Sequence, residues 1–145
     1  YLFNLEQTAH SPHYYYHKFD PEDQKSHRRS VYRFVVRSQP NPFMTTLDCA
    51  DSSQSTPRRN ETLTALQALS LLNNKFTLSM SQHFAERLSK EVSGMENQVR
   101  AGFELVTGRS PNAEEHRLLL EYADKHGTPN LCRSLFSLSE FAFID

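Results

Sequence analysis

Three histidines near the start of the chain have a spacing that could bind a metal ion. His10, His13 and His17 lie three and four residues apart, and in a helix this spacing would place their imidazole rings on one face. Neutral imidazole is a common ligand of zinc. However, Pro12 interrupts a continuous helix, and no cysteine or acidic residue lies within the group. We therefore rank surface histidines that hydrogen-bond to the backbone above a metal site.

A second group that could do chemistry lies in a long polar loop. The carboxylates of Asp48 and Asp51 could act as general acid and base or hold a cation, and the guanidinium groups of Arg58 and Arg59 could clamp an anion such as sulfate or a sugar acid. In the alternative interpretation, these groups hydrogen-bond the loop and cap the helix that follows it. We favour this structural role, because arginine and aspartate in such connections more often serve architecture than catalysis.

The sequence contains no other signature of catalysis. Ser30, Ser55 and Thr56 lack the Gly-x-Ser-x-Gly context of an activated nucleophile, and the four glycines form no phosphate-binding loop. Neither Cys49 nor Cys132 has a neighbouring histidine, and two independent buried thiols are favoured over a bridge between them. We therefore predict no catalytic residue and no cofactor in this chain.

Composition limits the classes of partner. The formal charge of −1, from 16 basic and 17 acidic residues, provides no field for nucleic acid or an anionic membrane. No run of about 18 apolar residues is present to form a transmembrane segment. The apolar fraction of 37% is low beside the usual value of about 45–50% with glycine counted. We expect that part of the chain lacks a core of its own or packs on something absent from it. The oligomeric state stays open.

The strongest structural signal is a helix over residues 64–74, which we expect to lie enclosed at the centre of the domain. Its apolar residues cover most of the helix circumference. They are Ala65, Leu66, Ala68, Leu69, Leu71 and Leu72. Thr64 and Gln67 have the spacing of a capping box at its start. Asn73 and Asn74 tolerate the left-handed conformation that often ends a helix.

The remaining periodicity predicts an all-α fold, an irregular orthogonal bundle of about five helices with an extended N-terminal arm. Residues 1–27 form the irregular arm, and residues 28–145 form the helical domain. Apolar residues recur at three- and four-residue steps in the other predicted helices. These cover residues 75–90, 95–106, 110–126 and 130–138, with a short helical turn over 43–47. Residues 28–37 fit either a helix or a strand, and we predict a helix because no second strand is evident to pair with it.

Five segments resemble the planctomycete surface domain, a bacterial family. They are Arg28-Arg29-Ser30-Val31-Tyr32, Leu47-Asp48-Cys49-Ala50-Asp51, Arg58 to Asn73, Leu105 to Pro111, and Ser139-Glu140-Phe141. The resemblance extends over about residues 26–145. The chain departs from the family pattern at Ala65, where many relatives carry proline, and at Glu61 and Ser139, where they often carry a basic residue and asparagine.

The resemblance implies a domain of unknown function, number 1553, near the C-terminus of large exported, periplasmic or cell-surface proteins of Planctomycetes and related bacteria. Such proteins often carry a c-type cytochrome module. This chain lacks Cys-x-x-Cys-His, so any haem c would belong to an upstream module. We interpret the chain as a non-catalytic structural or interaction module that packs on the upstream domain. The alternative is an active site shared with that domain, for polysaccharide-related or cytochrome-linked chemistry.

Overall fold

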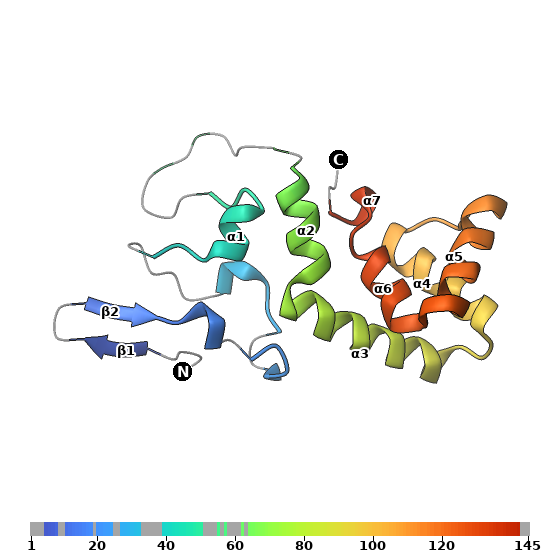
Figure 1. The fold of residues 1–145 in the computed structure, drawn as a ribbon, viewed down its shortest axis with the longest axis horizontal. Coiled ribbons are helices and arrows are strands. Elements are labelled where there is room, and N and C mark those ends of the chain that lie inside the picture. The colour runs from blue at the N-terminus through green and yellow to red at the C-terminus, as the bar shows by residue number, and fades with distance from the viewer. Residues whose placement is uncertain are drawn as a thin grey trace. The chain divides into compact units, whose positions relative to one another are not determined.

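A computed structural model of the chain separates into two compact units, Tyr1–Ser70 and Leu71–Asp145. The structure describes residues 5–8, 11–18, 20–24, 27–32, 39–50, 55, 57, 62 and 64–142. These residues contain seven α-helices and one pair of short strands, shown in Figure 1. The all-α prediction is therefore confirmed. The helix α2 (Ala65–Asn73) begins in the first unit and ends in the second.

The N-terminal arm contains a β-hairpin that the sequence analysis did not predict. Strand β1 (Leu5–Thr8) pairs antiparallel with β2 (Ser11–Tyr14), and a 3-10 helix η1 (Tyr16–Lys18) follows. A four-residue strand presents only two residues to each face, which is too few to produce a recognisable alternation. Pro12 is compatible with β2, because both strands of a two-stranded sheet are edges, where proline is tolerated.

The predicted helix over residues 28–37 is only partly described. Ser30–Tyr32 forms a 3-10 turn, η3, closed by the Tyr32 N–H, which donates to the Arg29 carbonyl oxygen at 3.0 Å. The Val31 side chain in this turn is 74% exposed. Residues 33–38 lie outside the described part of the chain.

The predicted turn over residues 43–47 is confirmed as the short helix α1 (Pro42–Thr46). The Asn41 side chain accepts hydrogen bonds from the backbone N–H groups of Phe43 (3.0 Å) and Met44 (3.3 Å), and Pro42 needs no such partner. After the helix, Asp48 has a φ of +55°, a left-handed conformation that aspartate tolerates better than most residues. This turn sets the direction of the Asp48 side chain.

Helix α2 confirms the predicted segment and its capping box, but its burial is the reverse of the prediction. Gln67 is its buried residue, at 5% exposed, whereas Leu66 and Leu69 are 62% and 56% exposed. Leu72 is half-buried. A helix enclosed on all sides was therefore wrong. The buried side of the helix carries the polar Gln67, whose amide donates to Asp48 and Thr62. Leu66 and Leu69 lie on the exposed side.

The end of α2 at Asn73 is confirmed, although by a different cap from the predicted one. Asn74 has a φ of −66° and begins α3, where its side chain accepts a hydrogen bond from the Phe76 N–H at 2.9 Å. The Arg133 side chain donates to the Leu72 carbonyl oxygen at 2.7 Å and to the Asn73 Oδ1 at 2.8 Å. An arginine from a distant helix thus satisfies a terminal carbonyl that a left-handed cap would otherwise serve.

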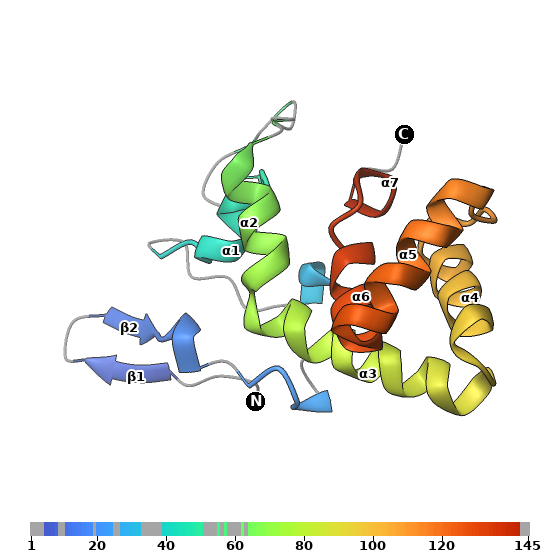
Figure 2. The same cartoon turned by 45° about the vertical axis from the view of Figure 1, so that its right-hand side comes forward.

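The second unit is a group of helices with α6 at its centre. Its helices are α3 (Lys75–Glu91), α4 (Met95–Thr107), α5 (Ala113–His126), α6 (Thr128–Leu135) and α7 (Ser139–Ala142). Helix α6 contacts α3, α4 and α5, as the two views in Figures 1 and 2 agree. Leu131 and Leu135 pack with Val99, Phe103 and Ala123, and Cys132 packs with Ala85 and Leu88. One helix therefore supplies both apolar clusters.

Two predicted boundaries in this unit were displaced. Helix α5 begins at Ala113 and not at Ser110–Pro111, because Asn112 and Glu115 form a complete capping box two residues later. The helix predicted over residues 130–138 is α6, which begins earlier, at Thr128, and ends at Leu135, so that residues 136–138 form a turn before α7. The predicted stop at Gly127 is confirmed.

The face by which α3 packs consists mainly of small residues. Thr77, Ser81, Ala85 and Leu88 are buried, whereas His83 and Arg87, which the periodicity placed on the packed face, are exposed. Gly102 of α4 is buried against this face, and a Cβ at that position would lie 3.0 Å from Leu88 Cδ1. Small residues at these positions let α3 and α4 approach closely.

Truncating the centre of α6 should destabilise the second unit strongly. Leu131 is fully buried, so Leu131→Ala should lower the free energy of unfolding by about 2–5 kcal/mol. The matched control is Leu118→Ala on α5, since Leu118 is 50% exposed and surface substitutions usually change stability by less than about 0.5 kcal/mol. Urea unfolding followed by circular dichroism measures both. Equal effects would contradict the central placement of α6.

Candidate functional site

The histidine group remains a prediction in most respects. His10 lies outside the described residues, and for His13 and His17 the backbone is described but not the side chains. His13 belongs to strand β2 and His17 to the 3-10 helix η1. The two residues therefore do not share one α-helical face, which was the arrangement considered for metal binding.

The loop group is described at one of its four residues. Asp48 follows α1, whereas Asp51, Arg58 and Arg59 lie outside the described residues. The Asp48 Oδ2 accepts three hydrogen bonds: from the Thr62 N–H (2.7 Å), from the Thr62 hydroxyl (2.8 Å) and from the Gln67 Nε2 (2.9 Å). Asp48 thus ties the two ends of the loop together. This contact supports the structural role favoured from the sequence, because the oxygen is saturated by donors.

Gln67 is the centre of this polar network, and its long-range role was not predicted. Its Nε2 also donates to the Thr62 Oγ1 at 2.9 Å, and its Oε1 accepts from the Thr64 N–H at 2.9 Å. In return, the Gln67 N–H donates to the Thr64 Oγ1 at 3.2 Å. One buried amide therefore caps α2 and holds the loop before it. The available signal was a polar side chain within a mostly apolar helical segment.

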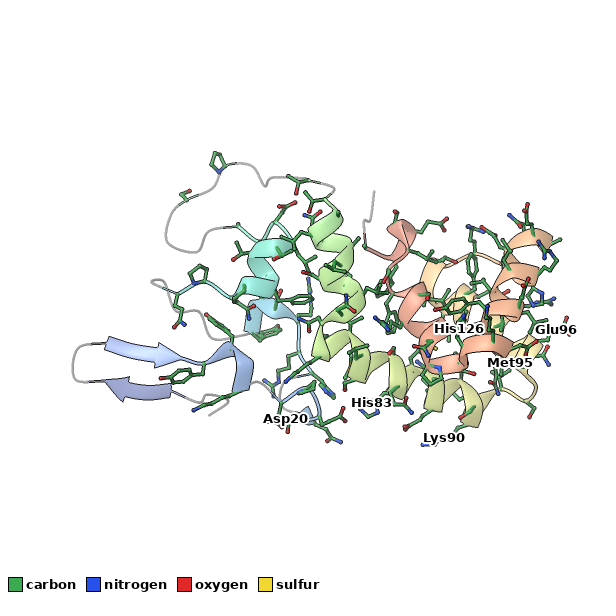
Figure 3. All side chains as sticks on the ribbon, in the orientation of Figure 1. Asp20, His83, Lys90, Met95, Glu96 and His126 are labelled. Carbon is green, nitrogen blue, oxygen red and sulfur yellow. The ribbon has the colours of Figure 1, made fainter. Side chains whose placement is uncertain are left out.

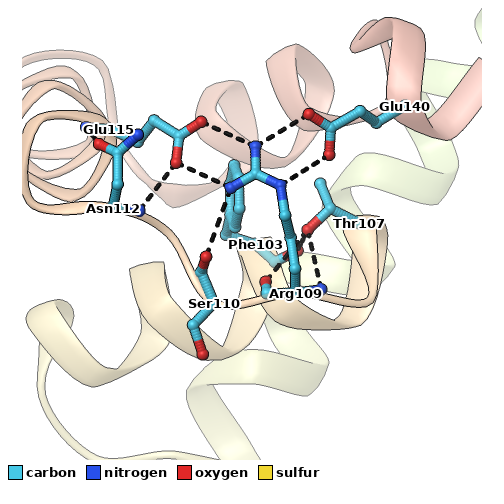
Figure 4. A network of polar contacts seen from close by, with 7 residues as sticks. All are labelled: Phe103, Thr107, Arg109, Ser110, Asn112, Glu115 and Glu140. Atoms are coloured by element: carbon cyan, nitrogen blue, oxygen red, sulfur yellow. Dashed lines mark hydrogen bonds and ion pairs between the residues drawn. The ribbon is translucent and has the colours of Figure 1, made fainter.

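A second polar network, the Arg109 clamp, joins the C-terminus of α4 to α5 and α7 (Figure 4). Arg109 makes paired contacts with Glu115, Nη1 to Oε2 at 2.9 Å and Nη2 to Oε1 at 2.8 Å. It makes a second pair with Glu140, Nε to Oε2 at 3.0 Å and Nη2 to Oε1 at 2.8 Å. Its Nη1 also donates to the Ser110 carbonyl oxygen at 3.3 Å. All five donors of the guanidinium are used.

Local structure directs Arg109 into the clamp. Gly108 takes a left-handed conformation, with φ 75°, that ends α4, so the chain turns immediately before Arg109. The Thr107 hydroxyl donates to the Phe103 carbonyl oxygen at 2.9 Å. The guanidinium carbon lies 4.8 Å from the centre of the Phe103 ring, a cation–π arrangement. The clamp is therefore fixed from below by an aromatic ring and from both sides by carboxylates.

The clamp shifts the ionisation of its members in the direction expected for ion pairs. Hydrogen bonds from Arg109, assisted by the backbone at Asn112, lower the pKa of Glu115 to about 2. Hydrogen bonding to Arg109 also lowers the pKa of Glu140, and the two carboxylates raise the pKa of Arg109. Each group is thereby held in its charged form at neutral pH. No group in the clamp is poised to exchange a proton near neutrality.

A hollow of about 360 Å³ lies beside the clamp, between α4 and α5. It is lined by Arg100, Glu104, Ser110, Pro111, Asn112, Ala113 and His116. The Ser110 hydroxyl donates to the Glu104 carboxylate at 2.7 Å, and the Asn112 side chain accepts from the Glu115 N–H at 2.8 Å. The lining therefore contains both basic and acidic side chains, and several of its polar atoms already hydrogen-bond within the protein.

The described residues contain no group of three or more histidine, cysteine, aspartate or glutamate side chains that could hold a metal ion. His83 on α3 and His126 at the end of α5 lie on different helices (Figure 3). Cys49 and Cys132 are both free, as expected, but only Cys132 is buried, and burial raises the pKa of its thiol to about 12. Cys49 is exposed, contrary to the prediction. No described helix is long and apolar enough to cross a membrane.

Removing the buried amide at position 67 should loosen the start of α2. Gln67→Ala removes the side-chain acceptor of the Thr64 N–H and leaves the Asp48 carboxylate without one donor, a loss of about 1–3 kcal/mol for a buried polar contact. We expect faster amide hydrogen exchange at residues 67–70, measured by NMR. Gln82→Ala is the matched control, because Gln82 is exposed and its side chain donates a hydrogen bond to Glu86 in its own helix. Unchanged exchange in Gln67→Ala would contradict the bridging role.

Acidic pH should reduce the stability that the Arg109 clamp contributes. The folded-state pKa of Glu115 is about 2 and its ordinary value is 4.5, so its stabilisation is present above 4.5 and is lost as the pH falls toward 2. We expect the difference in urea midpoint between wild type and Arg109→Gln to be largest at neutral pH and to shrink in this range.

The control for this titration is Arg117→Gln. Arg117 pairs with Glu121 at 3.6 Å on the exposed side of α5, where an ion pair contributes little. Its midpoint should stay close to that of wild type at every pH. A gap for Arg109→Gln that does not change between neutral pH and pH 2 would refute the ionic origin of the clamp.

Comparison with known proteins agrees with the resemblance seen in the sequence. A family model, PSD1, described as a protein of unknown function (DUF1553), matches residues 4–123, well over half of the chain. No curated protein matches the chain. No solved structure matches it. The matched residues include Asp48, Gln67 and Arg109, the centres of the two polar networks. The chain belongs to the PSD1 (DUF1553) family of proteins of unknown function.

Proposed function

We propose that this chain is a non-catalytic structural or interaction module of a larger exported or cell-surface protein, and that it packs against its neighbouring domain through α2. The observation that carries the proposal is the exposed face of α2. Leu66 and Leu69 are 62% and 56% exposed, and Ala65 and Ala68 are exposed beside them. The nine residues of α2 include no charged side chain. An uncharged apolar helical face is typical of a surface that a partner covers.

The polar chemistry of the chain supports a non-catalytic role. Asp48 accepts three hydrogen bonds with one oxygen and holds a loop. Arg109 uses every donor on two carboxylates and a carbonyl. A catalytic acid, base or nucleophile needs a group that is free to react and a pKa suited to its task. The described groups with shifted pKa values are instead fixed in one charge state or buried as a thiol. We therefore place the proposed shared active site second.

The test compares the isolated chain with the full-length protein that contains it. Amides of α2 should exchange more slowly in the full-length protein, because the neighbouring domain covers them. Leu66→Gln with Leu69→Gln should abolish this extra protection and leave the melting temperature of the isolated chain nearly unchanged, since both side chains are exposed. Leu118→Gln on α5, also half-exposed, is the matched control and should keep the protection.

Two results would overturn the proposal. Equal exchange of α2 in the isolated chain and the full-length protein would mean that no neighbour covers the helix. A large fall in the melting temperature of the isolated double variant would mean that the leucines pack within the chain itself.

A further inference from the structure

One partner in the Arg109 clamp is carried on a short, weakly buried element. Helix α7 has four residues and buries none of them. The Glu140 side chain is 51% exposed, and Phe141 is 44% exposed. The backbone N–H groups of Phe141 and Ala142 both donate to the Leu138 carbonyl oxygen at 3.0 Å. Among the described residues of this segment, Glu140 and Phe141 contact the rest of the unit through their side chains.

The surface that receives Glu140 is built without α7. Arg109 is bound by both oxygens of Glu115, at 2.9 and 2.8 Å, and by the Ser110 carbonyl oxygen, and it lies over the Phe103 ring. These contacts fix the plane of the guanidinium. They leave Nε and one hydrogen of Nη2 directed at Glu140 (Figure 4). Two parallel donors in a fixed plane are a preorganised receptor for a carboxylate.

The surface that receives Phe141 is likewise held from its other side. The Phe136 ring stacks on the Phe141 ring, with centroids 5.2 Å apart and planes at 28°. It also stacks on the Phe84 ring of α3, with centroids 5.5 Å apart. Phe136 therefore keeps an aromatic partner whether or not Phe141 is present. Stacked aromatic pairs contribute about 0.5–1.5 kcal/mol beyond the area that they bury.

We propose that Arg109 and Phe136 form a recognition site for a glutamate followed by a phenylalanine. In this structure, Glu140 and Phe141 of the same chain occupy the site. The same two residues from a second copy of the chain can replace them. Ser137 and Leu138, which link Phe136 to α7, are the hinge for this exchange. Exchange of an identical element costs little, because every contact is regenerated in the complex. What the second copy must overcome is the effective concentration of the tethered α7, about millimolar for a short linker.

The test uses two variants of the whole 145-residue chain. One lacks the residues that occupy the recognition site, and the other lacks the arginine of the site. The acceptor carries Glu140→Ala and Phe141→Ala, so its recognition site has no occupant. The donor carries Arg109→Ala, so its α7 has no receptor. Titration of unlabelled donor into ¹⁵N-labelled acceptor should shift the Arg109 Nε–H resonance and the amides of residues 107–112. The shifts should saturate with a midpoint of roughly millimolar or below.

The control donor adds Glu140→Gln to Arg109→Ala, which keeps the shape of α7 and removes its charge. Its midpoint should rise at least about tenfold, because the paired ionic contact is lost. The acetylated and amidated pentapeptide Leu-Ser-Glu-Phe-Ala serves as a second donor that needs no folding, and Glu140→Gln alone serves as a milder acceptor.

Three outcomes would overturn the proposal: no shift with either donor up to its solubility limit, equal midpoints for the glutamate and glutamine donors, or unfolding of both acceptors. The last would mean that α7 is an integral part of the unit and cannot be exchanged.

Discussion

The burial of one face of α6 is the constraint on which the second unit depends. Leu131, Cys132 and Leu135 are fully buried, and they divide between the two apolar clusters that join α3, α4 and α5. The burial of these residues fixes the rotation of α6 about its axis, and this rotation sets where the neighbouring side chains point. Arg133 reaches the end of α2, and Phe136 stacks with Phe84 and Phe141. The polar cap and the aromatic stack are thus consequences of an apolar helix seated in its place.

Different kinds of interaction stabilise the interior of each unit. All the buried apolar side chains of the described residues lie between positions 85 and 135, in the second unit. Within the described part of the first unit, the buried side chain is Gln67, and the long-range contacts that fix it are hydrogen bonds to Asp48 and Thr62. Each such bond contributes only about 1 kcal/mol net. The apolar core of the described residues therefore lies in the second unit.

Local signals in the sequence predicted the helices, and long-range contacts explain what it did not predict. The capping box of Thr64 and Gln67, and the stop at Gly127, depend on residues within one helical turn, so pattern alone identified them. Which side of α2 is buried depends on Asp48 and Thr62, and the α2 cap depends on Arg133, sixty-one positions from Leu72. The hydrogen bonds of Asp48 agree with the structural role favoured from the sequence, but its partners Thr62 and Gln67 were not identified. Arg109 was overlooked because Glu140 is distant in sequence.

Four of the five segments that carry the family resemblance meet in two pairs in the structure. The segment around Asp48 binds the segment containing Thr62 and Gln67. The segment containing Arg109 binds the one containing Glu140. Each pair is joined by a carboxylate with several donors, and each closes a connection or a helix terminus. Residues used in this way determine architecture, since carboxylates saturated by fixed donors are poor acids and bases. These segments of the family resemblance therefore supply contacts that hold the fold of this chain.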